Sequence, residues 1–255
     1  MKSISRRAFF KTGISLAGTV AASSVTASIC GLGTAEQPLG PFFPNEGTPV
    51  DPIRESDGGP ISAANDNDLS FIRGRTGTAD GQLFELSGKI IDQNCEPVES
   101  ASVVIWQASH TGWYNHRGDN DNKRFVHPVT GSVMERKHDS SFQYWGKDIS
   151  ASDGSYNFRS IVPGFYPANL NAKWYRPPHV HFLISAPGYK QLITQMYFKG
   201  DIKDDDFVQS LNQSDYLLQD ENLSEAERDA LVVQFTENQK GILTGSFDIQ
   251  IQKLF

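Results

Sequence analysis

Short apolar runs separated by turn residues dominate the chain from residue 83 onward. Alternating apolar and polar positions, rich in β-branched and aromatic residues, are typical of strands with one buried face. Asp, Asn, Gly and Pro gather between the runs, as at residues 152–154 and 187–188, and these residues favour turns. We predict a mostly β fold, an antiparallel β-sandwich with long active-site loops. The predicted strands are 83–91, 101–109, 155–161, 179–185, 191–198 and 245–253.

Two segments depart from this strand pattern. Residues 224–235 (SEAERDALVVQF) predict a short C-terminal helix, because Ser224 and Glu227 have the spacing of a capping box. Residues 111–152 are polar and irregular, and a loop of that length in a compact domain is uncommon unless it is functional. We interpret this stretch as an active-site wall. The alternative is a disordered insertion, against which its aromatic residues argue.

The first 75 residues are not part of the predicted sandwich, which we place at residues 76–255. Residues 36–75 are rich in Pro, Gly, Asn and Asp and predict an extended arm. The apolar cluster at 41–44 (PFFP) indicates that this arm packs on the core or on a neighbouring subunit.

Residues 1–35 have the features of a twin-arginine export signal. Arg6 and Arg7 precede a run of small and apolar residues, and no acidic residue occurs before residue 36. Small residues allow cleavage after Ala27 or after Ala35. A membrane anchor is the alternative, but Gly, Ser and Thr interrupt the run. We therefore expect a periplasmic or secreted protein, and this export route favours a metal or redox group inserted before export.

Charge and cysteine content restrict the function further. The whole chain has a formal charge of −7, and loss of the four basic residues in the signal would make it −11. We expect no nucleic-acid binding, since that depends on clustered Lys and Arg. Only Cys30 and Cys95 occur, so the sequence excludes a disulfide framework and a cysteine-based metal site. Any metal would be held by His, carboxylate or Tyr.

The segment HVHF, residues 179–182, is the strongest candidate for chemistry. Strand alternation puts His179 and His181 on one face, where two imidazoles can converge on one ion. Taken alone, this spacing also fits a structural strand. No Asp or Glu stands beside the histidines, whereas Tyr114, Tyr166 and Tyr175 occur in neighbouring motifs. Phenolate is a hard anionic donor that suits ferric iron, while a zinc hydrolase would need a third ligand and a carboxylate base.

Four segments in order resemble the intradiol ring-cleavage dioxygenases, most closely their protocatechuate branch. They are WQASHTGWYNHRGD (106–119), SDGSYNFRSIVPGFYP (152–167), WYRPPHVHFLIS (174–185) and LITQMYF (192–198). The resemblance implies a non-haem Fe(III) enzyme that cleaves a catechol ring with O2, between the two hydroxyl-bearing carbons, to a cis,cis-muconate-type diacid. The metal ligands that it implies are Tyr114, Tyr166, His179 and His181.

The resemblance also implies three residues that surround the substrate. Arg176 matches an arginine over the bound ring, where its charge would stabilise the anion that develops. Gln195 matches a pocket glutamine, and Trp106 occupies a tryptophan position of the family pattern. Tyr166 would have a second role, as the proton acceptor for the incoming diol.

Some features differ from the protocatechuate branch. Ala168 stands where that branch has an aromatic residue, the segment between Tyr114 and Tyr166 is longer, and this chain comes without a related partner chain. The catechol derivative therefore stays open, as does assembly into a homo-oligomer. A non-catalytic transthyretin-like or carboxypeptidase-regulatory-like binding module is the alternative. It would explain the strands but not Arg176, the two histidines and Tyr114 together.

Overall fold

The computed structural model describes residues 31–43, 66–116, 118–119 and 121–255. The first 30 residues of the predicted export signal and residues 44–65 of the predicted arm lie outside the described residues. No helix in the described part is long and apolar enough to cross a membrane.

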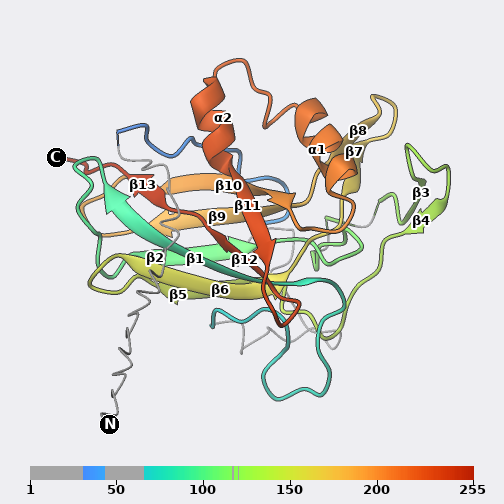
Figure 1. The fold of residues 1–255 in the computed structure, drawn as a ribbon, viewed down its shortest axis with the longest axis horizontal. Coiled ribbons are helices and arrows are strands. Elements are labelled where there is room, and N and C mark those ends of the chain that lie inside the picture. The colour runs from blue at the N-terminus through green and yellow to red at the C-terminus, as the bar shows by residue number, and fades with distance from the viewer. Residues whose placement is uncertain (1–30, 44–65, 117, 120) are drawn as a thin grey trace, which may run out of the picture.

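The described chain is mostly β (Figure 1). Its nine-stranded sheet follows the order β13-β1-β12-β11-β10-β9-β2-β5, and β6 pairs with β1 off this path. Two hairpins, β3-β4 and β7-β8, stand apart from it. The strands are β1 (Leu83–Asp92), β2 (Ser102–Trp106), β3 (Arg124–Val126), β4 (Val133–Glu135), β5 (Trp145–Ile149), β6 (Ser155–Ile161), β7 (Tyr166–Asn169), β8 (Trp174–Arg176), β9 (His179–Ser185), β10 (Leu192–Gly200), β11 (Val232–Glu237), β12 (Leu243–Ser246) and β13 (Ile249–Ile251); the helices are α1 (Asp205–Ser214) and α2 (Glu225–Leu231).

The large sheet is mixed, which corrects the antiparallel expectation. Strand β1 pairs in parallel with β12 and β13, and β10 pairs in parallel with β11, while the other five pairings are antiparallel. The predicted strand 245–253 is divided in two because Phe247 and Asp248 bond to the middle of β1: Phe247 N donates to Ser87 O and Lys89 N donates to Asp248 Oδ1. The division into two packed sheets stays a prediction, because hydrogen bonds join these strands into one path.

The strands and the helix whose signals are local in sequence were predicted well. Strands β1, β6 and β9 begin and end within a residue of the expected positions. Helix α2 has the full capping box, with Glu227 N donating to the Ser224 side chain and Ser224 N donating to Glu227. The helix ends at Leu231, however, and the last four residues of the predicted helix belong to β11.

The irregular stretch 111–152 contains more strand than predicted. Hairpin β3-β4 forms within it, and β5 pairs with β2 along its full length. Helix α1 and strands β7, β8 and β11 were also missed. Strand β11 pairs with β10 and β12, and the β7-β8 hairpin is short and has an irregular register, so periodicity within these strands carries little signal.

The main core lies between the strands and is rich in phenylalanine. The rings of Phe84, Phe198 and Phe235 pack with centroids 4.9–5.5 Å apart, and each is fully buried. Burial of one such side chain contributes about 2 kcal/mol. A smaller cluster at the end of β2 contains Trp106, Ala108, Tyr114 and Tyr166. This second cluster contains two of the predicted metal ligands, Tyr114 and Tyr166.

Residues 31–43 run along one edge of the sheet, next to β10 and β13. Gln37 N donates to Ile193 O at 2.9 Å, and Gln250 N donates to Thr34 Oγ1 at 2.8 Å. Ala35 is part of the main core. The last residues of the predicted signal, 31–35, and the start of the predicted arm are therefore bonded to the sheet.

Candidate functional site

Strand β9 places both predicted histidine ligands on one buried face. His179 and His181 are each 2% exposed, and their rings lie 4.9 Å apart. Val180 and Phe182 point to the opposite face and join the main core. The alternation predicted for HVHF is therefore observed, and it turns both imidazoles toward the second cluster.

Tyr114 meets both histidines. Its Oη lies 3.2 Å from Nε2 of His179 and 3.2 Å from Nε2 of His181. The turn that brings it there needs glycine at 112, because φ is +81° and a Cβ would lie 2.5 Å from Phe165 O. The same close approach sets Tyr166 beside Tyr114, with ring centroids 5.7 Å apart. All four predicted ligands thus converge on one buried point.

Both imidazoles are held neutral. Burial, together with the nearby charge of Arg176, lowers the pKa of His179 and of His181 well below the usual range. Pro177 O lies 2.6 Å from His179 Nδ1, which favours the proton on Nδ1 and leaves the Nε2 lone pair facing Tyr114. A neutral imidazole with a free lone pair is the form that binds a metal ion.

Both phenols are costly to ionise without a cation. Burial raises the pKa of Tyr114 well above its ordinary value and also raises that of Tyr166. A bound cation of high charge would reverse this preference, because it displaces the phenol protons. Two phenolates and two neutral imidazoles would then offset most of the charge of Fe(III). The donor set therefore fits ferric iron.

Arg176 is fixed beside these ligands by three partners. Its Nε donates to Asp215 Oδ2 at 2.8 Å, and its Nη2 donates to Gln195 Oε1 at 2.6 Å and to Tyr197 Oη at 3.2 Å. Asp215 is fully buried and also accepts the indole N–H of Trp174. Sequence reasoning missed Asp215, since it lies 39 residues from Arg176 and belongs to no motif.

A cavity of about 390 Å³ opens next to the ligands. Tyr166, Arg176 and Ala168 line one side of it, and Asp119 and Arg136 line another. The predicted wall, residues 111–152, thus contributes to the lining. Tyr175, in contrast, packs against Phe125 and Phe165.

Trp106 and Gln195 lie next to His181 and Arg176, respectively. Neither is among the described residues that line this cavity. The Trp106 ring stacks on His181 at 4.8 Å with an interplanar angle of 8°. Gln195 is fully buried and donates to Pro38 O at 3.0 Å. Direct contact of these two residues with substrate stays a prediction.

The arm supplies the third side of the cavity. Phe42 packs on Tyr114 with ring centroids 4.7 Å apart, and Phe43 packs on Trp106 at 4.8 Å. A Cβ on Gly40 would lie 3.1 Å from Cε1 of His181, and φ there is +76°. The PFFP cluster indicated that the arm packs somewhere, but no signal in the sequence located the contact at the ligands.

A buried ion pair between Arg136 and Asp119 contacts both predicted tyrosine ligands. Arg136 and Asp119 are 2% and 3% exposed and lie 2.6 Å apart. Asp119 accepts Tyr114 N at 2.7 Å, and Arg136 donates to Gly112 O while its guanidinium lies 5.2 Å from the ring centroid of Tyr166. Burial raises the pKa of Asp119, although Arg136 opposes the shift. Sequence reasoning missed this pair.

One group of His and carboxylate donors occurs elsewhere in the described chain. Asp80, His110 and Asp139 place donor atoms within 4.8 Å of one another. Asp139 already accepts hydrogen bonds from the backbone N–H groups of Asp80 and Ser141. We therefore interpret its carboxylate as part of a turn and not as a metal ligand. No such group in the described residues includes His179 or His181, so the carboxylate ligand that a zinc hydrolase needs is not found there.

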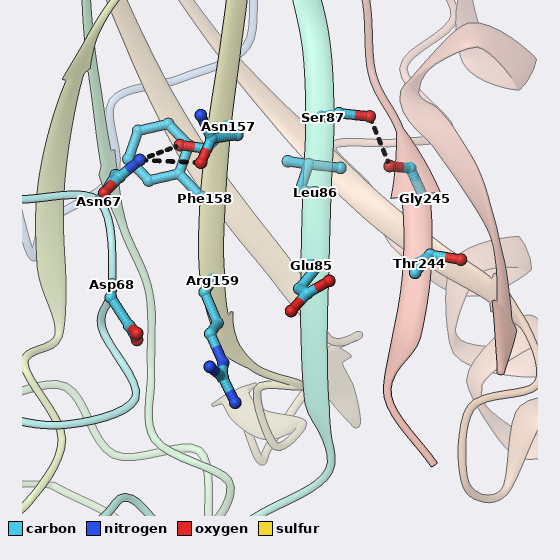
Figure 2. Close-up of a pocket in the computed structure, with 10 residues that line it drawn as sticks. All are labelled: Asn67, Asp68, Glu85, Leu86, Ser87, Asn157, Phe158, Arg159, Thr244 and Gly245. Carbon is cyan, nitrogen blue, oxygen red and sulfur yellow. Dashed lines mark hydrogen bonds between the residues drawn. The ribbon is translucent and has the colours of Figure 1, made fainter. Parts of the chain in front are cut away.

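A second cavity, of about 450 Å³, lies on the outer face of the sheet. Figure 2 shows its lining on β1, β6 and β12, with Asn67 and Asp68 on a neighbouring loop. Its polar side chains pair locally: Asn67 donates to the Asn157 side chain at 2.9 Å, and Ser87 donates to Gly245 O at 3.5 Å. Both Ser87 and Asn157 are exposed.

Comparison with known proteins points to one family. The family described as Dioxygenase matches residues 58–252. The β chain of protocatechuate 3,4-dioxygenase from Burkholderia cepacia is 31% identical over 137 residues, which are 53% of this chain and 53% of that protein. Catechol 1,2-dioxygenase 2 from Acinetobacter lwoffii is 28% identical, over 49% of this chain and 43% of that protein. This chain thus spans about half the length of these relatives.

Solved structures share the fold. The 3-chlorocatechol 1,2-dioxygenase of Rhodococcus opacus superposes with a TM-score of 0.55 at 21% identity, covering 87% of this chain and 73% of that one. An intradiol ring-cleavage dioxygenase from Tetranychus urticae gives a TM-score of 0.52 at 21% identity, covering 88% and 96%.

Proposed function

This chain belongs to the dioxygenase family, and we propose that it cleaves a catechol-type ring with O2 between the two hydroxyl-bearing carbons, giving a cis,cis-muconate-type diacid. One observation carries the proposal. Tyr114, Tyr166, His179 and His181 converge in a buried site whose imidazoles are neutral and whose phenols need a cation to ionise. A non-catalytic binding module has no need for this combination.

The four side chains would hold Fe(III). Ferric iron bound there would supply Lewis-acid activation of a diol. The protein keeps the ligands in place through Pro177 O on His179, the Trp106 ring on His181 and the Asp119–Arg136 pair around the tyrosines. Outer partners of this kind fix the tautomer and the orientation of metal ligands.

Tyr166 is the residue that we assign as proton acceptor. It is the one predicted ligand that lines the cavity, so it is placed to meet an incoming hydroxyl group. Burial raises the pKa of its phenol, so the phenolate form that bound Fe(III) would favour would be a strong base toward an incoming diol. A catechol that enters the cavity can therefore transfer a proton to Tyr166 without a separate histidine or carboxylate.

Arg176 is the residue that we assign to stabilise negative charge on the ring. It lines the cavity, and Asp215, Gln195 and Tyr197 fix its guanidinium before substrate arrives. A preorganised cation in a site that excludes water stabilises a developing anion more than a mobile one does. Gln195 orients Arg176 and also ties it to the arm through Pro38 O.

The substrate that we propose is a small aromatic diol. The names of relatives include catechol, hydroxyquinol and chlorocatechol dioxygenases, and a cavity of about 390 Å³ has room for such a ring. The small side chain of Ala168 also lines this cavity. Assembly into a homo-oligomer stays a prediction.

The reaction can be tested with isotopically labelled O2. Iron-loaded protein would be supplied with catechol, hydroxyquinol and protocatechuate in turn, while O2 uptake is recorded and the product analysed by mass spectrometry. We expect an acyclic diacid that contains both oxygen atoms of one O2 molecule. A semialdehyde, formed by cleavage beside the diol, or no turnover of any of the three would contradict the proposal.

A further inference from the structure

We infer that the cavity beside Tyr166 takes diols whose ring substituents are uncharged or positively charged, and that Asp121 disfavours a ring that carries a carboxylate. The inference rests on the proposed function, because it names the class of diol that the same site accepts. It goes against the relative from Burkholderia cepacia, whose name gives protocatechuate, a carboxylated diol, as its substrate.

The arginines of the cavity already have partners for their charges. Arg136 and Arg176 are the basic residues in the described lining. Arg136 lies 2.6 Å from Asp119, and Arg176 lies 2.8 Å from Asp215. The four side chains are at most 6% exposed, so each pair is close and little screened by water. A carboxylate on the substrate would meet no described arginine whose charge is unmatched.

The hydrogen-bond donors of Arg136 are also engaged. Its Nε and Nη2 donate to Gly112 O, its Nη1 donates to Asp121 O at 2.9 Å, and its Nη2 donates to both carboxylate oxygens of Asp119. A substrate carboxylate would have to replace some of these bonds. Loss of a partner for a buried charged group is costly, so Arg136 is a poor receptor for a second anion.

Arg176 belongs to the diol end of the cavity. It is directly opposite Tyr166 in the β7-β8 hairpin, and both residues line the cavity. Its Nε and Nη2 donate to Asp215, Gln195 and Tyr197. This position suits the ring and its oxygens, and not a substituent on the far side of the ring.

Asp121 adds a negative charge that no described residue offsets. It lines the cavity and is exposed. The ion pairs among the described residues do not include it. Its charge acts across the cavity wall: burial is the main cause of the raised pKa of Asp119, and Asp121 raises that pKa further. The same charge would repel a carboxylate on a bound ring.

The rest of the lining suits uncharged substituents. It includes the apolar side chains of Pro38, Pro41, Phe42, Pro167 and Leu217. These groups can pack on an apolar or halogenated ring position, but they offer no hydrogen bond to a charged one, which would lose its hydration. An unmatched charge of the wrong sign, next to an apolar wall, excludes one class of ligand and leaves another unaffected.

Binding without O2 tests the inference apart from turnover. Iron-loaded protein would be titrated anaerobically with protocatechuate, with its amide and with dopamine, a catechol that carries an ammonium group, and each Kd measured by calorimetry. The amide has the size of protocatechuate but no charge. We expect protocatechuate to bind about three- to tenfold more weakly than the amide and dopamine, the range for one exposed charge, and the difference to shrink at high salt.

Protocatechuate that binds as tightly as its amide would overturn the inference, as would a failure of all three diols to bind. Turnover of the same diols with O2 tests the proposed function separately. The expected order of binding without ring cleavage would contradict the proposed function and not the charge preference.

Asp121→Asn tests the residue itself. It should bring the Kd of protocatechuate severalfold closer to that of the amide, because the repulsive charge is gone. Asp229→Asn is the matched control, since Asp229 is exposed on α2 and is not in the described lining of the cavity. An unchanged difference in Asp121→Asn, or an equal change in both variants, would show that Asp121 does not determine the preference.

Discussion

Two cavities of similar volume differ in the side chains around them. The groove over β1, β6 and β12 measures about 450 Å³ (Figure 2), and the pocket beside β7 and β8 about 390 Å³. In the groove, Glu85, Ser87, Asn157 and Thr244 are exposed. Around the pocket, the histidines, tyrosines and arginine of the site are at most 6% exposed.

The difference indicates that volume alone does not identify an active site. Exposed polar groups on a sheet keep much of their contact with water, so their presence costs little and needs no functional reason. Buried ionisable groups lose that hydration, and a protein keeps several of them together only where their interactions or a ligand offset the loss. The pocket, and not the larger groove, is therefore the expected reaction site.

The largest expected effect is that of His181→Ala. Removal of one imidazole should abolish iron binding and lower activity by well over about 10²-fold, since loss of an outer partner alone can cost that much. Iron content and O2 uptake measure the result. His110→Ala is the matched control, because His110 is an exposed histidine outside the pocket. Full iron and turnover in His181→Ala would remove His181 from the ligand set.

Arg176→Lys should separate chemistry from binding. The lysine ammonium keeps the positive charge but lacks the planar guanidinium group, which hydrogen-bonds to Asp215 and Gln195 at the same time. We expect iron and catechol to bind as in the wild type, while kcat falls by about 10²-fold, the loss typical of one misplaced electrostatic group. A normal kcat would exclude Arg176 from the reaction.

Asp215→Asn tests a positioning residue that does not line the described cavity. The amide keeps the shape of the carboxylate but no longer offsets the Arg176 charge. We expect kcat to fall by about tenfold, less than in Arg176→Lys, with iron content unchanged. Loss of iron together with activity would indicate a merely structural role.

Gly40→Ala, in the arm, and Gly33→Ala, just before it, form a matched pair. Both glycines have positive φ, +76° and +77°, so alanine should destabilise each variant by about 1 kcal/mol. The added methyl group of Gly40→Ala would lie 3.1 Å from His181, whereas that of Gly33→Ala meets Gln250 at 3.8 Å. Only Gly40→Ala should change iron affinity, measured by chelator competition. Equal affinities would show that the arm does not influence the metal ligands.

The smallest effect is expected in the groove. Ser87→Ala removes an exposed hydroxyl that donates to Gly245 O at 3.5 Å. The free energy of unfolding should change by no more than about 0.5 kcal/mol, and kcat should stay constant. A clear loss of activity would mean that the groove takes part in function and that the comparison of the two cavities is wrong.

The parts of the structure that could be predicted are those with local signals. Alternation within residues 179–185 predicted both the strand and the shared face of His179 and His181. The capping box predicted helix α2. The Asp119–Arg136 pair and the Asp215 contact join residues 17 and 39 positions apart. Asp119 and Arg176 lie in the family-like segments, but their partners Arg136 and Asp215 do not, so neither contact could be read from the sequence.

The central claim, a ferric site open to diols, is tested most directly by the visible absorption spectrum. Iron-loaded protein without its signal would be measured before and after anaerobic addition of catechol. We predict a broad tyrosinate-to-iron charge-transfer band that moves to longer wavelength when catechol binds. A colourless protein, with zinc or with no metal bound, would contradict the account.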